Sequence, residues 1–250
     1  MNDSHRNIRH MNDSPLKPTP TRHGIVLAMQ EELEALLERL PEVQTFSRGA
    51  FTFWQGYLGN QEVCAIKSGV GKVNAAMSTQ ALIDYFTPEV LWVVGVAGAL
   101  SPDLHIGDVL LGVEALQHDI DASALGFLPG EVPYDERSTY VADARLITCA
   151  QKVGGELFGA RFKTGRVLSG DRFIAGSDEV RRLRERFAGD CVEMEGAAVA
   201  QVAQKNKLPF VIIRTISDRA DGQAPQDFPR FLKEAAKDVA LFIERLILSC

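Results

Sequence analysis

The sequence contains no long run of basic residues and no uninterrupted apolar stretch long enough to cross a bilayer. Its 250 residues carry a formal net charge of −6. Because nucleic acids and anionic membranes attract basic surfaces, this charge balance disfavours both as partners. We therefore expect neither a nucleic acid nor a membrane among the partners of the chain.

Cysteine is scarce and scattered. The four cysteines, Cys64, Cys149, Cys191 and Cys250, form no CxxC pair and no cluster with histidine. A structural zinc site and a disulfide framework are therefore both unexpected. This cysteine pattern is typical of a protein of the reducing cytoplasm, where we expect the chain to be found.

Residues 1–22 are polar, contain Pro15, Pro18 and Pro20, and lack the apolar stretch of a secretory signal peptide. This composition predicts a disordered N-terminal extension. Hydrophobic residues make up 46% of the whole chain and charged residues 24%, which are ordinary values for a globular protein. No linker and no internal repeat divides residues 23–250, so we expect one domain there.

Apolar runs alternate with segments of helical spacing along this domain. Leu33, Leu36, Leu37 and Leu40, for example, follow the i, i+3, i+4, i+7 pattern of a helix face. Residues 90–95 form an uninterrupted apolar strand, as expected inside a sheet covered on both faces. The alternation predicts an α/β fold with a mostly parallel sheet in three layers. The expected strands are 24–28, 51–57, 62–68, 90–95, 108–115, 162–168, 192–194 and 210–216, and the expected helices are 30–40, 72–86, 142–153, 178–187, 196–206 and 229–248.

The first candidate catalytic residue lies where the strand at residues 24–28 ends and a helix begins, a usual ligand position in open α/β sheets. Relative to the leucine stripe of that helix, Glu31 points to the opposite face, whereas Glu32 borders the stripe and can face a pocket. The first-turn position of Glu32 also favours its ionised form. A solvated, helix-capping acid is the alternative interpretation.

Glu195 begins a second apolar stripe, because Ala198, Val199 and Val202 follow it at spacings of three, four and seven residues. This pattern predicts a buried carboxylate, which needs a hydrogen-bonding partner. A ribose diol would be a suitable partner. A structural ion pair with Arg214 is the alternative.

The third candidate lies just beyond the carboxyl end of the apolar strand at residues 210–216. Ser217 and Asp218 occupy this position, which is again one where ligands bind. A turn or capping aspartate is the alternative interpretation.

Two nucleotide-binding motifs fail. Gly69-Val-Gly-Lys72 looks like part of a P-loop, but Ile66 stands where that motif has its first glycine and Val73 replaces the required serine or threonine. No GxGxxG motif follows a strand, so a dinucleotide site is not predicted.

Taken together, the motifs resemble those of the methylthioadenosine/S-adenosylhomocysteine nucleosidase family, in the same order, from about His23 to the C-terminus. The family implies a three-layer α/β/α sandwich of nucleoside-phosphorylase type with a central mixed sheet, a homodimer, and hydrolysis of an adenine nucleoside without a metal or an organic cofactor. The matching blocks are GIVLAMQEE (24–32), KSGVGKVNAA (67–76), VVGVAGAL (93–100), IGDV (106–109), QHDIDASALGF (117–127), SGDRFI (169–174), VEMEGAAVA (192–200) and RTISDRAD (214–221).

The resemblance also implies roles for the matching residues. Glu32 would be the general base that activates water, Asp218 the general acid that protonates N7 of adenine, and Glu195 the residue that holds the ribose hydroxyls. The implied substrate contacts are Phe173 and Ile174 at the base, Met194 at the sugar, Met29, Val70 and Phe228 at the sugar and 5′ substituent, Val96 by the reaction centre, and also Ser217 and Arg214. A neighbouring subunit would complete the 5′ pocket with Leu125, Phe127 and Pro129.

The proposed chemistry needs a protonated acid near the purine and an ionised base near the sugar. We expect burial to raise the pKa of Asp218 and the helix start to keep Glu32 charged. Water is the expected nucleophile, because the segment Trp92–Val96 offers no cation or hydroxyl for phosphate; many family members have serine at the position of Val96. The alternatives are an aminodeoxyfutalosine hydrolase, a phosphate-dependent purine nucleoside phosphorylase of the same fold, and a non-catalytic nucleoside-binding protein.

Overall fold

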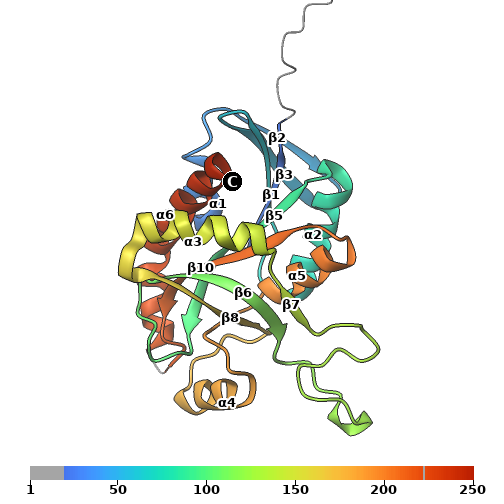
Figure 1. Cartoon of the computed structure of the whole chain (residues 1–250), viewed down its shortest axis with the longest axis vertical. Helices are drawn as coiled ribbons and strands as arrows, with labels where there is room; N and C mark the ends of the chain where they lie inside the picture. The colour runs from blue at the N-terminus through green and yellow to red at the C-terminus, as the bar shows by residue number, and fades with distance from the viewer. Residues whose placement is uncertain (1–19, 222) are drawn as a thin grey trace, which may run out of the picture.

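Figure 1 shows the chain as a computed structural model, which describes residues 20–221 and 223–250. The expected disordered extension, residues 1–22, lies outside the described residues except for its last three. The first strand begins at Arg22, so this residue belongs to the sheet. Among the described helices, none is both long and apolar enough to span a membrane.

Strands and helices alternate along the described chain, as expected. The strands are β1 (Arg22–Leu27), β2 (Val43–Arg48), β3 (Phe51–Leu58), β4 (Gln61–Lys67), β5 (Val90–Ala99), β6 (Val109–Gln117), β7 (Thr139–Val141), β8 (Phe162–Ser169), β9 (Cys191–Glu193) and β10 (Phe210–Asp218). The helices are α1 (Gln30–Leu37), α2 (Lys72–Phe86), α3 (Ala144–Phe158), α4 (Ser177–Phe187), α5 (Gly196–Lys205) and α6 (Ala224–Ser249), with two short 3-10 helices, η1 (Ser123–Leu125) and η2 (Gly159–Arg161).

Several elements differ from the sequence expectations, among them β7, which was not predicted, and α3, which spans Ala144–Phe158 instead of residues 142–153. Strand β2 was not predicted, because it is an edge strand with no buried residue and therefore no apolar pattern. Helix α1 ends at Leu37, three residues before the expected end. Helix α6 begins at Ala224 instead of residue 229, so Pro229 lies inside the helix and not at its start.

The strands form one sheet with the order β10-β6-β8-β9-β5-β1-β4-β3-β2, and β7 pairs with β6. This sheet is mixed, as the family resemblance implied, and not mostly parallel. Its parallel pairs are β1–β4, β1–β5, β5–β10, β6–β8 and β8–β9, and its antiparallel pairs are β2–β3, β3–β4, β5–β9, β6–β7 and β6–β10. Because β10 also pairs with β5, strands β10, β6, β8, β9 and β5 form a closed circuit.

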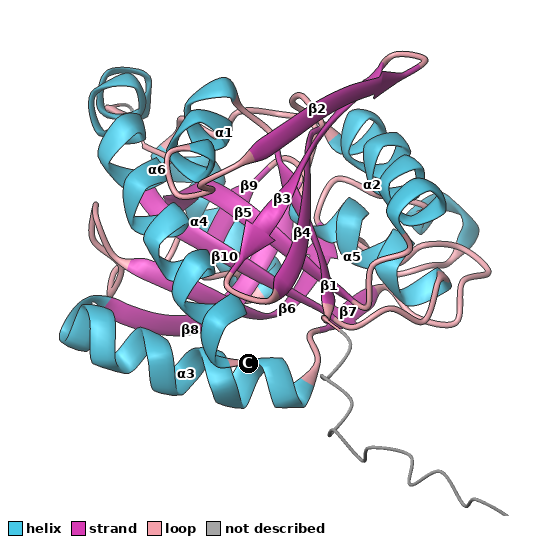
Figure 2. Cartoon of the chain, turned by 90° about the horizontal axis from the view of Figure 1, so that it is seen from above, coloured by secondary structure: helices cyan, strands magenta, loops and turns pink. Residues whose placement is uncertain are grey.

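Helices cover both faces of the sheet, which gives the expected three layers. Helix α6 packs on β5 and β10 and contacts α1 and α3, whereas α2 and α5 contact each other and pack on β1 and β8 respectively. Figure 2 shows these two groups of helices on opposite sides of the strands.

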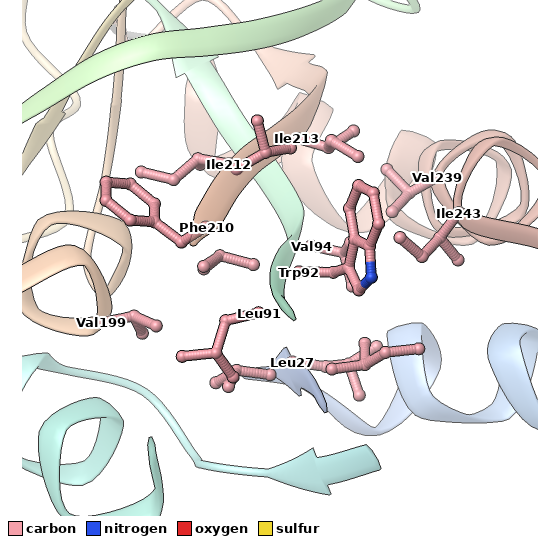
Figure 3. Close-up of a cluster of buried hydrophobic side chains, with 14 of the residues drawn as sticks. Leu27, Leu91, Trp92, Val94, Val199, Phe210, Ile212, Ile213, Val239 and Ile243 are labelled. Carbon is pink, nitrogen blue, oxygen red and sulfur yellow. The ribbon is translucent and has the colours of Figure 1, made fainter. Parts of the chain in front are cut away.

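The core lies between these layers and the central strands. Neighbouring residues Leu91 and Trp92 of β5 point to opposite faces: Trp92 lies beside Val239 and Ile243 of α6, and Leu91 lies on the side of Val199 in α5 (Figure 3). This period of two explains why a fully apolar run is needed in a strand covered on both faces. The core therefore anchors the strand whose carboxyl end reaches the functional site.

The expectation of no disulfide was wrong for one pair of cysteines. Cys149 of α3 and Cys250, which follows α6, form a disulfide with their Cα atoms 6.1 Å apart. The two residues are 101 positions apart in the sequence, and only the packing of α3 on α6 brings them together. Cys64 and Cys191 are free thiols buried in the core.

Candidate active site

A cavity of about 410 Å³ opens at the carboxyl ends of β1, β5 and β10. The loop between β8 and α4, the β9–α5 junction and the first turns of α6 complete its wall. Eleven of the residues expected at the site line it: Met29, Glu32, Val70, Val96, Phe173, Ile174, Met194, Glu195, Ser217, Asp218 and Phe228. The cavity therefore brings together side chains that are up to 199 positions apart in the sequence, from Met29 to Phe228.

Glu32 is buried, with 3% of its surface exposed, and its carboxylate is held by the backbone. One oxygen, Oε2, accepts hydrogen bonds from the N–H groups of Ala28 and Met29, each at 2.9 Å, and Oε1 accepts one from Val96 N–H at 3.3 Å. Glu32 reaches these donors because it lies in the first turn of α1, where the chain has just left β1.

The structure corrects one electrostatic expectation for Glu32. Burial raises the pKa of this carboxyl, and this effect outweighs the hydrogen bonds from Met29 and Ala28 and the charge of Arg214, which favour ionisation. The first-turn position alone predicts the opposite direction, a lowered pKa.

Glu195 is the N-cap residue of α5 and is also buried. Its Oε1 accepts a hydrogen bond of 2.8 Å from Gly71 N–H, at the start of α2. Gly71 has a φ of +100°, a conformation that favours glycine, and this turn directs its N–H at the carboxylate. Burial, together with the nearby charge of Glu193, raises the pKa of Glu195 to about 8.

Asp218 ends β10, just after an irregularity in its pairing with β5 between Ile216 and Asp218. Its Oδ1 accepts a hydrogen bond of 2.8 Å from Ala220 N–H, and its Oδ2 accepts one of 2.9 Å from the Ser217 hydroxyl. Burial raises the pKa of Asp218, as expected, since only 2% of the residue is exposed.

Arg214 does not pair with Glu195, which was the alternative that the sequence left open. It pairs with Glu193: the Nη2–Oε2 distance is 2.5 Å, the Nε–Oε2 distance is 3.2 Å, and both side chains are 3% exposed. The guanidinium also donates to the carbonyl oxygens of Val93 and Ile213. Arg214 therefore lies behind the cavity wall and not among its lining residues.

Sequence reasoning missed Glu193, which also lines the cavity. Its Oε2 accepts from the N–H groups of Gly196 at 2.7 Å and Glu195 at 3.2 Å, and its Oε1 accepts from the Ser169 hydroxyl. A charged residue in the short buried strand β9 was the available signal, because an ionised side chain there must have a partner. Glu193 thus joins β9, β10 and the start of α5.

The outer part of the cavity is apolar. Phe173, from the loop between β8 and α4, and Phe228 of α6 meet edge to face with their ring centroids 5.8 Å apart. Arg172 lies beside them and forms an ion pair of 2.9 Å with Glu179. Phe173 is 48% exposed, so the cavity is open on this side.

Leu125, Phe127 and Pro129 do not line this cavity. They belong to the segment between β6 and β7, in which Leu125 is 71% exposed and Phe127 meets Tyr134 edge to face. Within one copy of the chain, these three residues are separate from the three carboxylates. Among the described residues, no group of three or more His, Cys, Asp or Glu side chains could hold a metal ion.

Comparison with known proteins decides the family. The sequence profile of the phosphorylase superfamily matches residues 22–248. A 5′-methylthioadenosine/S-adenosylhomocysteine nucleosidase of Staphylococcus carnosus is 41% identical over 229 residues, which cover 90% of this chain and 99% of that protein. The chain belongs to the 5′-methylthioadenosine/S-adenosylhomocysteine nucleosidase family. The nucleosidase of Tolumonas auensis is 34% identical over 225 residues, covering 90% of this chain and 97% of the relative.

Solved structures of nucleosidases agree with this assignment and confirm the predicted fold. The nucleosidase of Neisseria meningitidis in complex with methylthio-immucillin-A superimposes with a TM-score of 0.89 at 36% identity, covering 92% of this chain and 100% of the other. The futalosine hydrolase of Helicobacter pylori also gives a TM-score of 0.89, at 32% identity, covering 92% of this chain and 98% of the other. The family that the sequence motifs predicted is therefore confirmed.

Proposed function

We propose that the chain is an N-glycosyl hydrolase that cleaves 5′-methylthioadenosine and S-adenosylhomocysteine with water, releasing adenine and the 5′-thioribose. One observation carries this proposal: the buried side chains of Glu32, Glu195 and Asp218, from three separate elements, line one cavity of a nucleosidase-family fold. The burial and hydrogen bonds of each carboxyl support the role proposed for it below.

Asp218 is proposed as the general acid. Adenine is a poor leaving group as an anion, so a proton on N7 lets it leave neutral. The burial that raises the pKa of Asp218 favours the protonated form that must donate. Ser217 donates its hydroxyl to Oδ2 and so orients the carboxyl.

Glu32 is proposed as the general base. Its carboxylate takes a proton from water as water attacks C1′ of the ribose, and its charge stabilises the positive charge that develops on the sugar. The three backbone N–H groups that bind Glu32 fix its orientation before substrate binds. Because its pKa is also raised, we expect activity to fall as acid protonates it.

Glu195 is proposed to accept hydrogen bonds from the ribose hydroxyls. Gly71 N–H occupies only its Oε1, so Oε2 can accept from the sugar. Met194, Met29 and Val70 would pack around the sugar and its 5′ substituent, and Phe173 and Ile174 around the base.

Water is favoured over phosphate as the nucleophile. Arg214, the cation nearest the inner part of the cavity, is already bound by Glu193, and Val96 offers a side chain without a hydroxyl. Arg172, at the outer part, is paired with Glu179. A phosphate dianion beside Glu32 and Glu195 would therefore lack a compensating charge.

The test is to incubate the protein with methylthioadenosine, S-adenosylhomocysteine and aminodeoxyfutalosine, with and without phosphate, and to follow free adenine. Release of adenine and a free thioribose, at a rate independent of phosphate, is expected. A phosphate-dependent rate and a sugar phosphate product would contradict hydrolysis. Tight nucleoside binding without adenine release would indicate a binding protein.

Hydrolysis of aminodeoxyfutalosine is the second candidate. The futalosine hydrolase of Helicobacter pylori has the same fold at 32% identity, with a TM-score equal to that of the meningococcal nucleosidase. The catalytic carboxylates act on the linkage that these nucleosides share, so the 5′ pocket decides the preference. The ratio of kcat/KM values for the three nucleosides distinguishes the candidates.

We also propose a homodimer in which Leu125, Phe127 and Pro129 of one subunit complete the 5′ pocket of the other. Apolar side chains are exposed on α2, where Val73 is 69% and Met77 is 55% exposed, which favours such an interface. Sedimentation should give twice the mass of the chain, and Met77→Glu should lower it. A monomer with full activity would contradict this proposal.

We also propose that the protein is located in the cytoplasm and acts in methionine salvage. The free thiols of Cys64 and Cys191 agree with a reducing compartment, whereas the Cys149–Cys250 disulfide disagrees. Trapping the thiols of freshly lysed cells tests it: four free cysteines are expected for the cytoplasmic protein.

A further inference from the structure

Two glycines interrupt the apolar residues of β5 near the cavity. Gly95 and Gly98 lie in the strand segment Val93-Val-Gly-Val-Ala-Gly98. Glycine in a strand costs conformational entropy and packs no side chain, so its presence often marks a place where another group approaches closely. In this structure, a carboxylate approaches each of the two glycines.

A Cβ atom on Gly95 would lie 2.8 Å from Oε1 of Glu32 and 3.2 Å from Nη1 of Arg214. A Cβ atom on Gly98 would lie 2.8 Å from Oδ1 of Asp218 and 3.0 Å from Cβ of Ala220. A separation of 2.8 Å is closer than real Cβ contacts, so the neighbouring group must move. The missing side chains therefore leave the space that the two carboxylates occupy.

The backbone conformation does not require glycine at either position. Neither Gly95 nor Gly98 has a positive φ, whereas Gly69 and Gly71 do. Alanine could adopt the same backbone, so a substitution acts through the added methyl group alone.

The space at Gly95 determines where Glu32 can lie. Its carboxylate is bound by Ala28 and Met29 through Oε2 and by Val96 through Oε1. A methyl group on residue 95 would press on Oε1 and weaken the bond to Val96, which is already the longest of the three at 3.3 Å. It would also enter the space between Glu32 and Arg214, whose charge favours the ionised carboxylate.

The space at Gly98 determines where Asp218 can lie. Gly98 is the register partner of Asp218 across the β5–β10 pair, directly after the irregularity in that pairing. Oδ1, which faces Gly98, is also the oxygen that accepts from Ala220 N–H. A methyl group on residue 98 would displace this oxygen and rotate the carboxyl of Asp218 away from the purine that it is proposed to protonate.

We propose that Gly95 and Gly98 are positioning residues, which place the general base and the general acid on opposite sides of one glycosidic bond by leaving space on a single strand. This inference rests on the roles proposed above for Glu32 and Asp218. It adds that β5, which carries neither carboxylate, sets the position of both.

The variants Gly95→Ala and Gly98→Ala test the proposal, with Gly24→Ala as the matched control. A Cβ on Gly24 of β1 would also meet an atom at 2.8 Å, but that atom is Cδ2 of Leu91 in the apolar core. Both site variants should lose about 10²-fold in kcat, the effect typical of a 1 Å misplacement, with little change in KM. Gly24→Ala should lower the melting temperature and leave kcat unchanged.

The pH profile separates positioning from a general loss of structure. Glu32 is faced by Arg214 and Glu195, and Asp218 by Asp221 and Asp227. Gly95→Ala should shift only the acidic limb of kcat, which Glu32 sets, and Gly98→Ala only the alkaline limb, which Asp218 sets. Gly24→Ala should shift neither limb.

Double variants complete the test. Gly95→Ala should cost no further activity in a Glu32→Gln background, while Gly98→Ala still should, because each glycine acts through one carboxyl. Unchanged kcat and pH limbs in both glycine variants, or failure of both to fold, would overturn the inference. Full activity of Glu32→Gln and Asp218→Asn would instead overturn the proposed catalytic roles.

Discussion

The cavity has two regions that are built in different ways. In the inner region, each carboxylate is held by backbone N–H groups or by a buried arginine, and none of its residues is more than 9% exposed. In the outer region, side chains from loops and helix starts contact each other and remain partly exposed. We define the inner region as the lining residues Glu32, Glu193, Glu195 and Asp218 together with Arg214 behind the cavity wall, and the outer region as Val70, Arg172, Phe173 and Phe228.

This difference indicates a division of labour. The backbone N–H groups of the inner region hold the carboxylates in fixed positions. Such fixed groups are suited to the bond-breaking step, because they need no rearrangement as charge develops. The outer region depends on apolar contact and is suited to selecting substrates. Changes in the inner region should therefore act on kcat or stability, and changes in the outer region on KM.

The largest effect is expected for the two catalytic carboxyls. Glu32→Gln and Asp218→Asn should each lower kcat by ~10²–10⁴-fold, since each removes one proton transfer. Their melting temperatures should stay close to that of the wild type, which removes misfolding as an explanation. Glu31→Gln, next to Glu32 in α1 but outside the cavity, is the control and should keep full activity.

The next largest effect is expected for the buried ion pair of Glu193 and Arg214. Glu193→Gln should destabilise the protein by about 3–5 kcal/mol, because it leaves the buried charge of Arg214 uncompensated. Urea unfolding measures this change. Glu114→Gln removes the partner of Arg166 in a pair whose side chains are 29% exposed, and should cost only ~0–1 kcal/mol. Equal losses in the two variants would remove the distinction between the regions.

A pH dependence of stability follows from Glu195. Its pKa of about 8 lies above the ordinary value of 4.5, so the folded state binds this proton more tightly than the unfolded chain. The stability that the proton contributes is complete below about pH 4.5 and is lost as pH rises to 8. Burial of Glu32 and Asp218 acts in the same direction.

Melting temperatures measured from pH 5 to pH 8 test this dependence. Glu195→Gln, which cannot ionise, should flatten the decline, and Glu34→Gln, on the exposed face of α1, should not. A decline that is identical in Glu195→Gln and the wild type would contradict the assignment to Glu195.

The smallest effect is expected in the outer region. Phe173→Ala removes the ring that is proposed to pack on the base, and an aromatic contact of this kind is typically worth about 0.5–1.5 kcal/mol, so KM should rise about tenfold or less. The value of kcat should change little, since this contact binds substrate and transition state alike. Tyr57→Ala, an exposed aromatic outside the cavity, controls for loss of surface area. A fall in kcat without a rise in KM would place Phe173 with the inner region.

The sequence predicts three of the four inner carboxylates, Glu32, Glu195 and Asp218, because their positions at strand ends and helix starts combine with the family motifs, whereas it does not predict Glu193. Glu32 lies in the first turn of the helix that follows β1, Asp218 is the last residue of β10, and Glu195 precedes an apolar helix stripe. The carboxyl ends of parallel strands share one edge of a sheet, so these signals converge. The sign of the pKa shift of Glu32 was missed because burial depends on the whole fold.

Other features could not be predicted because they depend on packing between distant elements. Arg214 pairs with Glu193, the last residue of strand β9. This strand is too short to show a periodic pattern in the sequence. The Cys149–Cys250 disulfide depends on the packing of α3 on α6. Leu125 does not line the cavity within one copy of the chain, so its part in the 5′ pocket stays a prediction that requires the proposed second copy.

Strand β10 is hydrogen-bonded along both of its sides, to β5 and to β6, and it closes the circuit of strands that carries the cavity. The part of β10 that precedes Asp218, residues 212–215, is therefore paired on both sides and has no free edge. Separating the two strands would require opening the whole ring and exposing its interior to water. We expect heat inactivation and loss of tertiary structure to share one midpoint, with no inactive intermediate that keeps the ring intact.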